Sequence, residues 1–294
     1  MVTGRRNSDD YWDALKGPKS ITFPKEYAGG EHLAIFCTQT SLKAPDQRHL
    51  VQQWCEMLSS LSAVTHVWFH SKVPQNLFDA ACRMPRLSAL WVKWSGIETA
   101  EAAADANKLR SLYLGLSARL SSLDPFTKMS QLRHLALESP SRIVDLKPLG
   151  QMTQLSELSA IGSFVGKPWK VKSLDPLGEL TSLEYLSIGK LQPERTSLRP
   201  LAKLKRLRFL GMDNHFPMKE YGWLSKHLQK TECMRFAPYD SGAGKAWKVE
   251  CRTCGKFDNV VLVTGKGGRW LCKLCDSDKV AAVEAAFERA GNAL

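Results

Sequence analysis

The sequence predicts an α/β protein: a curved solenoid with a parallel sheet on its concave side, a helical N-terminal cap and a small metal-stabilised C-terminal module. Two observations predict this fold class. An apolar motif returns at nearly constant intervals through the middle of the chain, and four cysteines near the C-terminus form two closely spaced pairs. With 294 residues, 44% of them hydrophobic and 24% charged, the chain can form one large domain plus an appendage and is not compositionally disordered.

Residues 1–63 are expected to form an N-terminal segment and cap. Residues 1–10 lack the apolar stretch of a signal peptide, so a secretory signal is not expected, and no apolar run nears the roughly 18 residues of a membrane-spanning helix. Residues 32–38 favour a strand. Residues 45–63 favour a helix with Leu50, Trp54 and Met57 on one apolar side, which is expected to cap the first edge of the solenoid.

Residues 64–236 carry a repeat in which apolar residues follow the pattern apolar-x-x-apolar-x-apolar. This spacing puts alternate side chains of a short strand into one core, while the intervening side chains face outward. The start-to-start steps are 23, 22, 23, 23, 28 and 24 residues, so neighbouring repeats are expected to stack into a solenoid. The seven copies are Val64, Val67 and Phe69; Leu87, Leu90 and Val92; Leu109, Leu112 and Leu114; Leu132, Leu135 and Leu137; Leu155, Leu158 and Ala160; Leu183, Leu186 and Ile188; and Leu207, Leu210 and Met212.

A second motif, Leu-x-Pro followed by Leu or Phe, lies between four of these strands and begins at Leu123, Leu146, Leu174 and Leu198. Proline fits the first turn of a short helix or 3₁₀ segment, because no N–H is needed there. Together, the two motifs resemble the leucine-rich repeat family in its short internalin-like or SDS22-like type, over about residues 60–236. The resemblance implies a solenoid whose parallel sheet lines the concave side.

Two features depart from that family. The asparagine that ties neighbouring turns in the family is missing, and its places hold Ser95, Ser117, Pro140, Ser163, Leu191 and His215. The 28-residue step is longer than the others, and its additional residues fall within 163–170. These residues are predicted to form a loop that bulges from one rim. Such an insertion can be a binding loop or a neutral one.

The outward strand positions form columns across stacked repeats, and the middle column begins with Trp68, Trp91 and Tyr113. Adjacent strands lie about 4.8 Å apart, so these rings are expected to form an aromatic strip. Exposed aromatic patches mark interaction surfaces, and the strip with its flanking columns is therefore the predicted partner-binding face. The flanking residues are His66, His70, Lys93, Trp94, His134, Glu138, Tyr185 and Phe209. The alternative is that the rings stack on one another or are covered by the N-terminal segment.

The formal charge of +12 raises the question of a nucleic-acid partner. Residues 1–107 carry 11 basic and 11 acidic side chains, whereas residues 108–236 carry 21 and 11. The basic side chains fall mostly on connectors, away from the aromatic strip, whereas sites for single-stranded nucleic acid interleave the two. A nucleic-acid-associated factor that uses residues 108–236 and the C-terminal module is therefore the alternative function, and a solubilising surface without a ligand is a third interpretation.

The C-terminal region is predicted as a linker (residues 237–248), a zinc ribbon (249–276) and a closing helix (277–294). Its proposed metal ligands are Cys251, Cys254, Cys272 and Cys275, two Cys-x-x-Cys pairs around a hairpin. This pattern supplies four thiolates for Zn²⁺ and resembles a zinc ribbon. A redox pair or a RING-type site is disfavoured, because both pairs flank one hairpin and the other four cysteines are scattered. Four cysteine ligands leave no open position for a catalytic water, so the zinc is expected to be structural.

The sequence therefore predicts a non-enzymatic module that binds another protein and is monomeric before binding. It has no phosphate-binding loop and no spacing typical of a catalytic triad or a carboxylate pair. Unpaired thiols beside a zinc site indicate a reducing compartment, which favours the cytoplasm. The resemblance implies protein recognition as the role; in bacteria, such proteins include cytosolic regulators and immunity proteins that neutralise a toxin.

Overall fold

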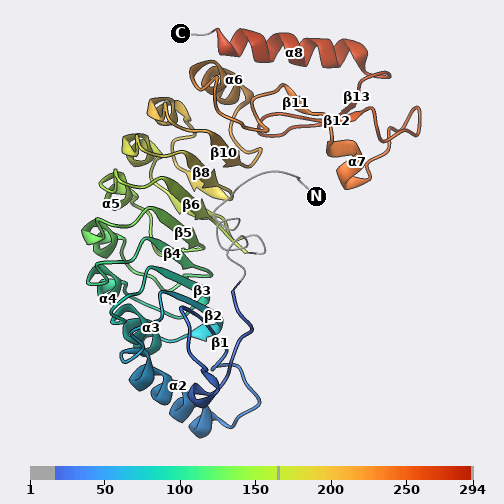
Figure 1. Ribbon diagram of the computed structural model, residues 1–294. Coiled ribbons are helices and arrows are strands. Elements are labelled where there is room, and N and C mark those ends of the chain that lie inside the picture. The colour runs from blue at the N-terminus through green and yellow to red at the C-terminus, as the bar shows by residue number, and fades with distance from the viewer. Residues whose placement is uncertain (1–16, 164–165, 293–294) are drawn as a thin grey trace.

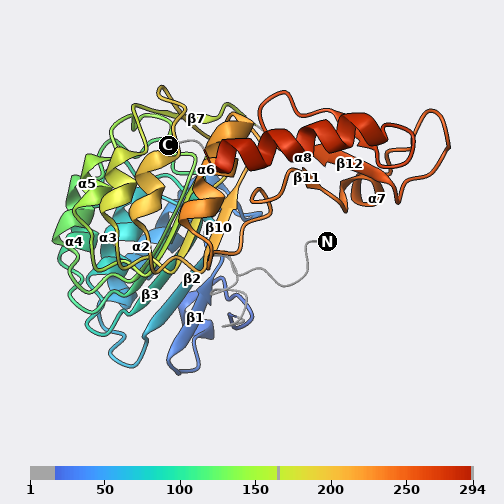
Figure 2. The ribbon, with the colours of Figure 1, turned by 90° about the horizontal axis from the view of Figure 1, so that it is seen from above.

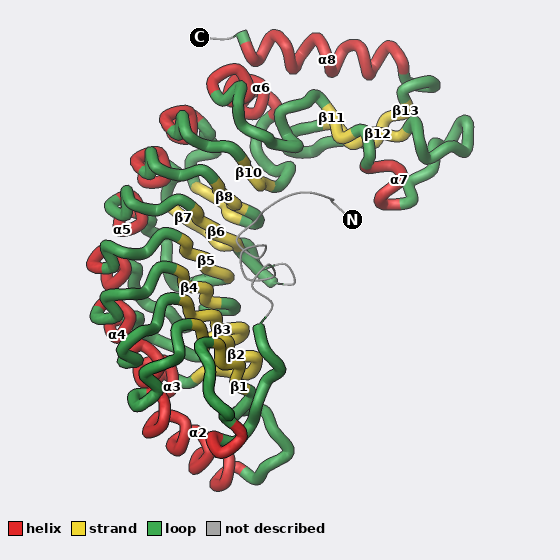
Figure 3. The backbone as a smooth tube through the Cα atoms, in the orientation of Figure 1, coloured by secondary structure: helices red, strands yellow, loops and turns green. Residues whose placement is uncertain are grey.

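The computed structural model describes residues 17–163 and 166–292, which form a curved solenoid with a C-terminal module at one end (Figure 1). The sheet lines the inner side of the curve and the helical connectors line the outer side (Figure 3). All eight strands of this sheet are parallel, in the order β1-β2-β3-β4-β5-β6-β8-β10, so the predicted solenoid with a parallel sheet is confirmed. The strands are β1 (His32–Ile35), β2 (His66–Val73), β3 (Ala89–Ser95), β4 (Ser111–Leu114), β5 (His134–Glu138), β6 (Glu157–Ile161), β8 (Tyr185–Ile188) and β10 (Phe209–Met212).

Alternation along each strand explains the core. The central residue of every predicted triplet pairs with its equivalents in the neighbouring strands, as Leu112 does with Leu90 and Leu135. The seven central residues are at most 2% exposed, and they belong to one continuous cluster that runs from Leu33 to Phe287. Every repeat adds one layer to this elongated core. The solenoid is therefore stabilised mainly by contacts between neighbouring repeats.

The convex layer consists of short helical connectors. Proline occupies the first turn of the four predicted ones, and the apolar residue after it is buried in each: Phe126, Leu149, Leu177 and Leu201. The elements of this layer are α2 (Ala44–Leu58), α3 (Gln75–Cys82), α4 (Glu101–Ala104), η2 (Asp124–Lys128), α5 (Lys147–Gly150), η3 (Asp175–Glu179) and η4 (Arg199–Lys203).

The turns after the strands are tied without the missing asparagine. The backbone N–H of Ser95 donates to the carbonyl of Gly115, that of Ser117 to Glu138, and that of Ser139 to Ile161, each with an N···O distance of 2.7 Å. Main-chain hydrogen bonds thus link successive turns in the place of a side-chain ladder.

The N-terminal part differs from the prediction in its boundaries. The predicted strand covers only His32–Ile35, and it pairs with β2, so the parallel sheet starts ahead of residue 64. The helix predicted over residues 45–63 is α2, which ends at Leu58 because the hydroxyls of Ser59 and Ser60 bond to carbonyls of its last turn. Helix α2 lies beside α3 in the convex layer.

Both edges of the sheet meet short segments of the same chain. At the first edge, Ile21 forms a parallel bridge with Ile35 of β1, just before the 3₁₀ turn η1 (Pro24–Glu26). At the last edge, Glu232 forms a parallel bridge with Phe209 of β10. These bridges use backbone groups that would otherwise face outward.

The insertion at the 28-residue step is partly ordered. Residues 164–165 lie outside the described residues, but β7 (Trp169–Val171) pairs with β9 (Leu191–Pro193) in a small parallel sheet. The Trp169 indole is buried and its Nε1–H donates to the carbonyl of Ile143 at 2.6 Å. The later part of the predicted loop is therefore packed against the solenoid.

The C-terminal module follows α6 (Met218–His227), which closes the last repeat. It contains the antiparallel strands β11 (Tyr239–Asp240), β12 (Val260–Val263) and β13 (Trp270–Cys272), with α7 (Ala243–Trp247) and α8 (Ser277–Gly291). None of the described helices is long and apolar enough to span a membrane.

The predicted linker over residues 237–248 is wrong, because β11 and α7 lie there. Gly244 of α7 is buried, and a Cβ at this position would lie 2.5 Å from the carbonyl oxygens of Phe257 and Val260. Glycine is therefore needed for a close backbone approach, not for flexibility.

The module is fastened to the end of the solenoid. The Asn214 amide donates to the carbonyl of Val263 at 2.9 Å and accepts from the N–H of Gly265 at 2.5 Å. Helix α8 packs along α6 and places Phe287 in the main core, and Figure 2 shows that β11–β13 project beyond the solenoid.

Candidate functional site

The concave face carries the predicted columns in the predicted register. Trp68 of β2 pairs with Trp91 of β3, which pairs with Tyr113 of β4. The column continues through small residues of the later strands, which are Ala136, Ser159, Ser187 and Gly211. The middle column is therefore aromatic in the first half of the solenoid and consists of small residues in the second.

The aromatic strip is less exposed than expected for a free surface. The Trp91 and Tyr113 rings stack with centroids 5.3 Å apart and an interplanar angle of 18°. Trp68 is 3% exposed and Tyr113 is 7% exposed, whereas Trp91 is half-buried. Trp91 is thus the member of the strip that presents most ring surface to a partner.

The start of the described chain accounts for part of this burial. Gly17 lies against the Trp68 indole, where a Cβ would be 3.1 Å from the ring, and Ser20 Oγ is 2.5 Å from His70 Nδ1. The alternative to partner binding was that the N-terminal segment covers the rings. This alternative therefore holds for Trp68 and His70. Sequence reasoning did not single out Gly17 or Ser20, because no motif marks either residue.

Three histidines flank the strip in half-buried positions. Burial is the main cause that lowers the pKa of His66, His70 and His134 below its ordinary value. His134 Nδ1 lies 2.8 Å from Ser111 Oγ, and the His70 ring meets Trp91 edge-on with centroids 5.3 Å apart. The imidazoles thus act as neutral packing and hydrogen-bonding groups. No carboxylate or thiol of the described residues joins them in a potential metal cluster.

The rest of the predicted face is more open. Lys93 is exposed, and its ammonium lies 4.7 Å from the centre of the half-buried Trp94 ring. Glu138 and Tyr185 are half-buried, and Phe209 at the far end is 9% exposed. The predicted residues therefore lie on one face, but their exposure ranges from buried to exposed.

The basic side chains of residues 108–236 lie largely on the convex connectors, where several are paired. Lys203 contacts Glu179 at 2.7 Å and Lys172 contacts Asp145 at 3.3 Å. The Glu184 carboxylate forms ion pairs with both basic side chains next to β10, Arg206 at 3.5 Å and Arg208 at 3.7 Å. These ion pairs between exposed groups reduce the excess charge that the segment offers to a polyanion.

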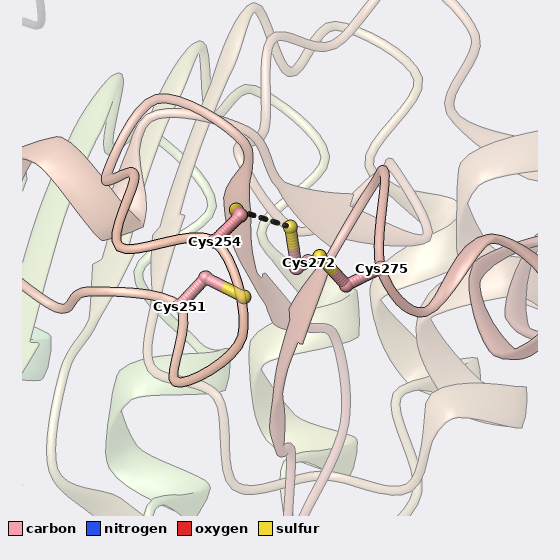
Figure 4. A group of neighbouring side chains, drawn as sticks. All are labelled: Cys251, Cys254, Cys272 and Cys275. Atoms are coloured by element: carbon pink, nitrogen blue, oxygen red, sulfur yellow. Dashed lines mark hydrogen bonds between the residues drawn. The ribbon is translucent and has the colours of Figure 1, made fainter.

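The four predicted metal ligands come together. Cys251 and Cys254 lie on the turn before β12, Cys272 ends β13 and Cys275 follows it, with all four sulfurs facing one another (Figure 4). Their Sγ atoms lie within 4.8 Å of one another, and Cys254 and Cys272 are 3.8 Å apart. Tetrahedral Zn–S bonds of about 2.3 Å place sulfurs about 3.8 Å apart, so the cluster can hold a metal ion of this size.

Backbone hydrogen bonds to the Cys251 sulfur favour its thiolate form, which is the form that binds a cation. Hydrogen bonds from the N–H groups of Cys254 and Thr253 are the main cause that lowers the pKa of Cys251 to about 6. The pKa of Cys275 is raised to about 12, chiefly by its hydrogen bond with Cys254. The backbone hydrogen bonds therefore favour a thiolate at Cys251, and a bound cation would favour the deprotonation of Cys275.

The other cysteines have a different environment. Cys37 and Cys82 are buried in the main core, and burial raises the pKa of both, that of Cys37 to about 12. All eight cysteines are free thiols, so no disulfide links the described elements.

No family model matches the chain, and no curated protein matches it. Solved structures with a similar fold include internalin C2 of Listeria monocytogenes, at 22% identity and a TM-score of 0.46, covering 60% of this chain and 71% of that one. A second internalin of Listeria monocytogenes has 20% identity and a TM-score of 0.43, over 59% and 54% of the two chains. A leucine-rich repeat protein of Leptospira interrogans has 14% identity and a TM-score of 0.45, over 73% and 52%. The matched region thus spans about half the length of the last two proteins.

Proposed function

We propose that the protein is a non-enzymatic module that binds a protein partner through the concave face of the sheet. The observation that carries the proposal is the stacked pair of Trp91 and Tyr113, which lies beside the exposed Lys93 on a rigid parallel sheet. The half-buried Trp91 ring is supported from below by the buried Tyr113 ring and has a charged side chain beside it, which is the composition of an interface hot spot.

The covered Trp68 refines this proposal. Because Gly17 lies on its indole, the first contact with a partner would involve Trp91, Trp94 and the columns toward Tyr185. Trp68 and His70 would join the interface only if residues 17–20 moved aside. The small residues Ser159, Ser187 and Gly211 leave room for side chains of the partner in the second half of the face.

The four-cysteine cluster is proposed to bind one structural Zn²⁺. Four thiolates satisfy a tetrahedral zinc ion and leave no position for substrate or water. This arrangement, with eight free thiols, favours a reducing compartment such as the cytoplasm. A monomer that acts as a cytosolic regulator or as an immunity protein against a toxin would fit these features.

The test compares capture of proteins from the native host by the wild-type chain and by single variants, with mass spectrometry as the readout. Trp91→Ala and Lys93→Glu should each weaken binding of a specific partner by about thirtyfold or more, since loss of a hot-spot contact costs at least about 2 kcal/mol. Lys93 is exposed, so its replacement tests the face without affecting the core.

Val144→Ala is the matched control, because Val144 is 49% exposed and lies between β5 and α5, outside the strands of the concave sheet. It should leave recovery unchanged. If both concave-face variants retain the partner while circular dichroism shows the wild-type fold, the concave face is not the binding site.

A further inference from the structure

The C-terminal module exposes two large aromatic side chains. Trp247, at the end of α7, is 73% exposed, and Trp270, at the start of β13, is 39% exposed; they are the two exposed tryptophans among the described residues. Neither indole has a ring partner or a hydrogen bond within residues 17–163 and 166–292. Large exposed aromatic groups of this kind mark surfaces that bind a ligand.

Both indoles lie on the same face of the three-stranded sheet. Leu271 packs under α8 with Val261, Val280 and Val283, so its neighbour Trp270 points to the opposite face. Helix α7 lies on that opposite face, where Gly244 approaches the side chain of Val260. Figure 1 likewise shows α7 and α8 on opposite sides of β12 and β13.

The charges of the module are unevenly distributed along its sequence. Residues 241–273 carry seven basic side chains and two acidic ones, whereas the other acidic residues lie mostly in α8 or next to it. Lys245 and Lys248 flank Trp247, and neither forms an ion pair within the described part of the chain. Four thiolates around Zn²⁺ would add two negative charges nearby, and Arg252 and Lys256 on the first cysteine turn offset them.

We propose that this face, defined by Trp247, Trp270, Lys245 and Lys248, binds single-stranded nucleic acid. Bases would stack on the two indoles, and the phosphates between them would lie near the two lysines. Sites for single strands combine aromatic platforms with unpaired cations in this way. The concave face has its aromatic strip and the basic segment in different places, so the module is the better candidate. A protein partner could also use exposed indoles, but the excess of basic over acidic side chains favours a polyanion.

The test uses the full-length, zinc-loaded chain and a fluorescein-labelled oligothymidylate of about 12 nucleotides, with fluorescence anisotropy as the readout. Affinity should fall steeply between about 50 and 200 mM salt. Trp247→Ala and Trp270→Ala should each weaken binding about 5- to 150-fold, the range for loss of one stacked base. The double variant Lys245→Glu/Lys248→Glu should weaken binding and also reduce its dependence on salt.

The double variant Lys167→Glu/Lys170→Glu is the matched control, because it changes the net charge equally on exposed positions of the solenoid insertion. It should bind like the wild type, and so should Trp91→Ala, which separates this site from the concave face. The proposal is overturned if the oligonucleotide does not bind at about 50 mM salt, or if either tryptophan can be replaced without loss. It is equally overturned if the Lys167/Lys170 variant loses as much affinity as the Lys245/Lys248 variant. Loss of a captured host protein from both tryptophan variants in nuclease-treated lysate, without oligonucleotide binding, would reassign the face to a protein partner.

Discussion

His134 illustrates how single residues link packing to solution conditions. Its ring is half-buried on β5 beside Ser111, and burial lowers its pKa below the ordinary value, as it does for His66, His70 and His215. In the unfolded chain these imidazoles titrate near pH 6.5, so between the lowered pKa and pH 6.5 the unfolded state binds more protons. Their contribution to stability is therefore complete above pH 6.5 and is lost as the pH falls.

We expect the urea midpoint of unfolding to fall as the pH is lowered from about 7 to about 5, because the unfolded state takes up the extra protons. His134→Asn should reduce the slope of this dependence, whereas Ser130→Ala, an exposed position without an ionisable side chain, should leave it unchanged. A midpoint that rises on acidification would show that these imidazoles are charged in the folded protein.

At the scale of residues, the sequence was sufficient to predict which side chains lie together wherever their spacing determines their positions in the fold. The column of Trp68, Trp91 and Tyr113 was predicted from the repeat. Side chains alternate between the two faces of a strand, and burial of the apolar triplets allows only one register between neighbouring strands. The cysteine cluster was predicted from its spacing for the same reason. The burial of Trp68 was only the alternative interpretation, because Gly17 reaches the indole across about fifty residues of chain and no recurring pattern marks Gly17.

At the scale of elements, the contact between α6 and α8 is the main attachment of the C-terminal module. Gly222 of α6 and Gly291 of α8 let the two backbones approach closely, and Lys226 reaches Glu288 at 3.0 Å. A Cβ on Gly222 would lie 2.8 Å from the carbonyl oxygen of Phe287, a distance that forces the helices apart.

Gly222→Ala should therefore lower the free energy of unfolding by about 1–3 kcal/mol, the usual effect of overpacking. Thermal unfolding followed by circular dichroism measures the change. Gly189→Ala is the control, because a Cβ there would have its nearest neighbour, Ile161 Cγ2, at an ordinary 3.7 Å. An equal loss of stability in both variants would show that the close contact between α6 and α8 is not the cause.

The elements that the sequence predicted well are those that repeat. The strands and the proline-containing connectors were placed by periodicity, since each copy supports the interpretation of the next. Helix α7 was mistaken for a linker, because its run of small residues has the composition of a flexible segment. The composition of such a segment does not reveal that Gly244 is buried against Val260.

At the scale of the whole molecule, a metal-dependent module is joined to a solenoid that has its own core. The small core of the module, with Val261, Val263 and Leu271, is separate from the main cluster. Modules of this size rarely fold without a metal ion or another cross-link. The two parts should therefore differ in their response to metal removal.

Treatment with a chelator, or the variant Cys272→Ser, should abolish hydrogen-exchange protection in residues 239–275 while β2–β6 stay protected. Native protein should contain about one zinc per chain. Cys55→Ser on α2 is the control, because Cys55 lies outside the cluster and should leave the metal content unchanged. Full protection of the module after complete removal of metal would contradict the structural role.

The two isolated bridges at the ends of the sheet have a consequence for self-association. A parallel sheet with open edges is a template on which further copies can add strand by strand and grow into fibres. Here Ile21 occupies the outer edge of β1 and Glu232 that of β10, so each end is sealed by backbone from the same chain. A second copy would have to displace one of these segments before it could polymerise, which keeps the stack of repeats finite.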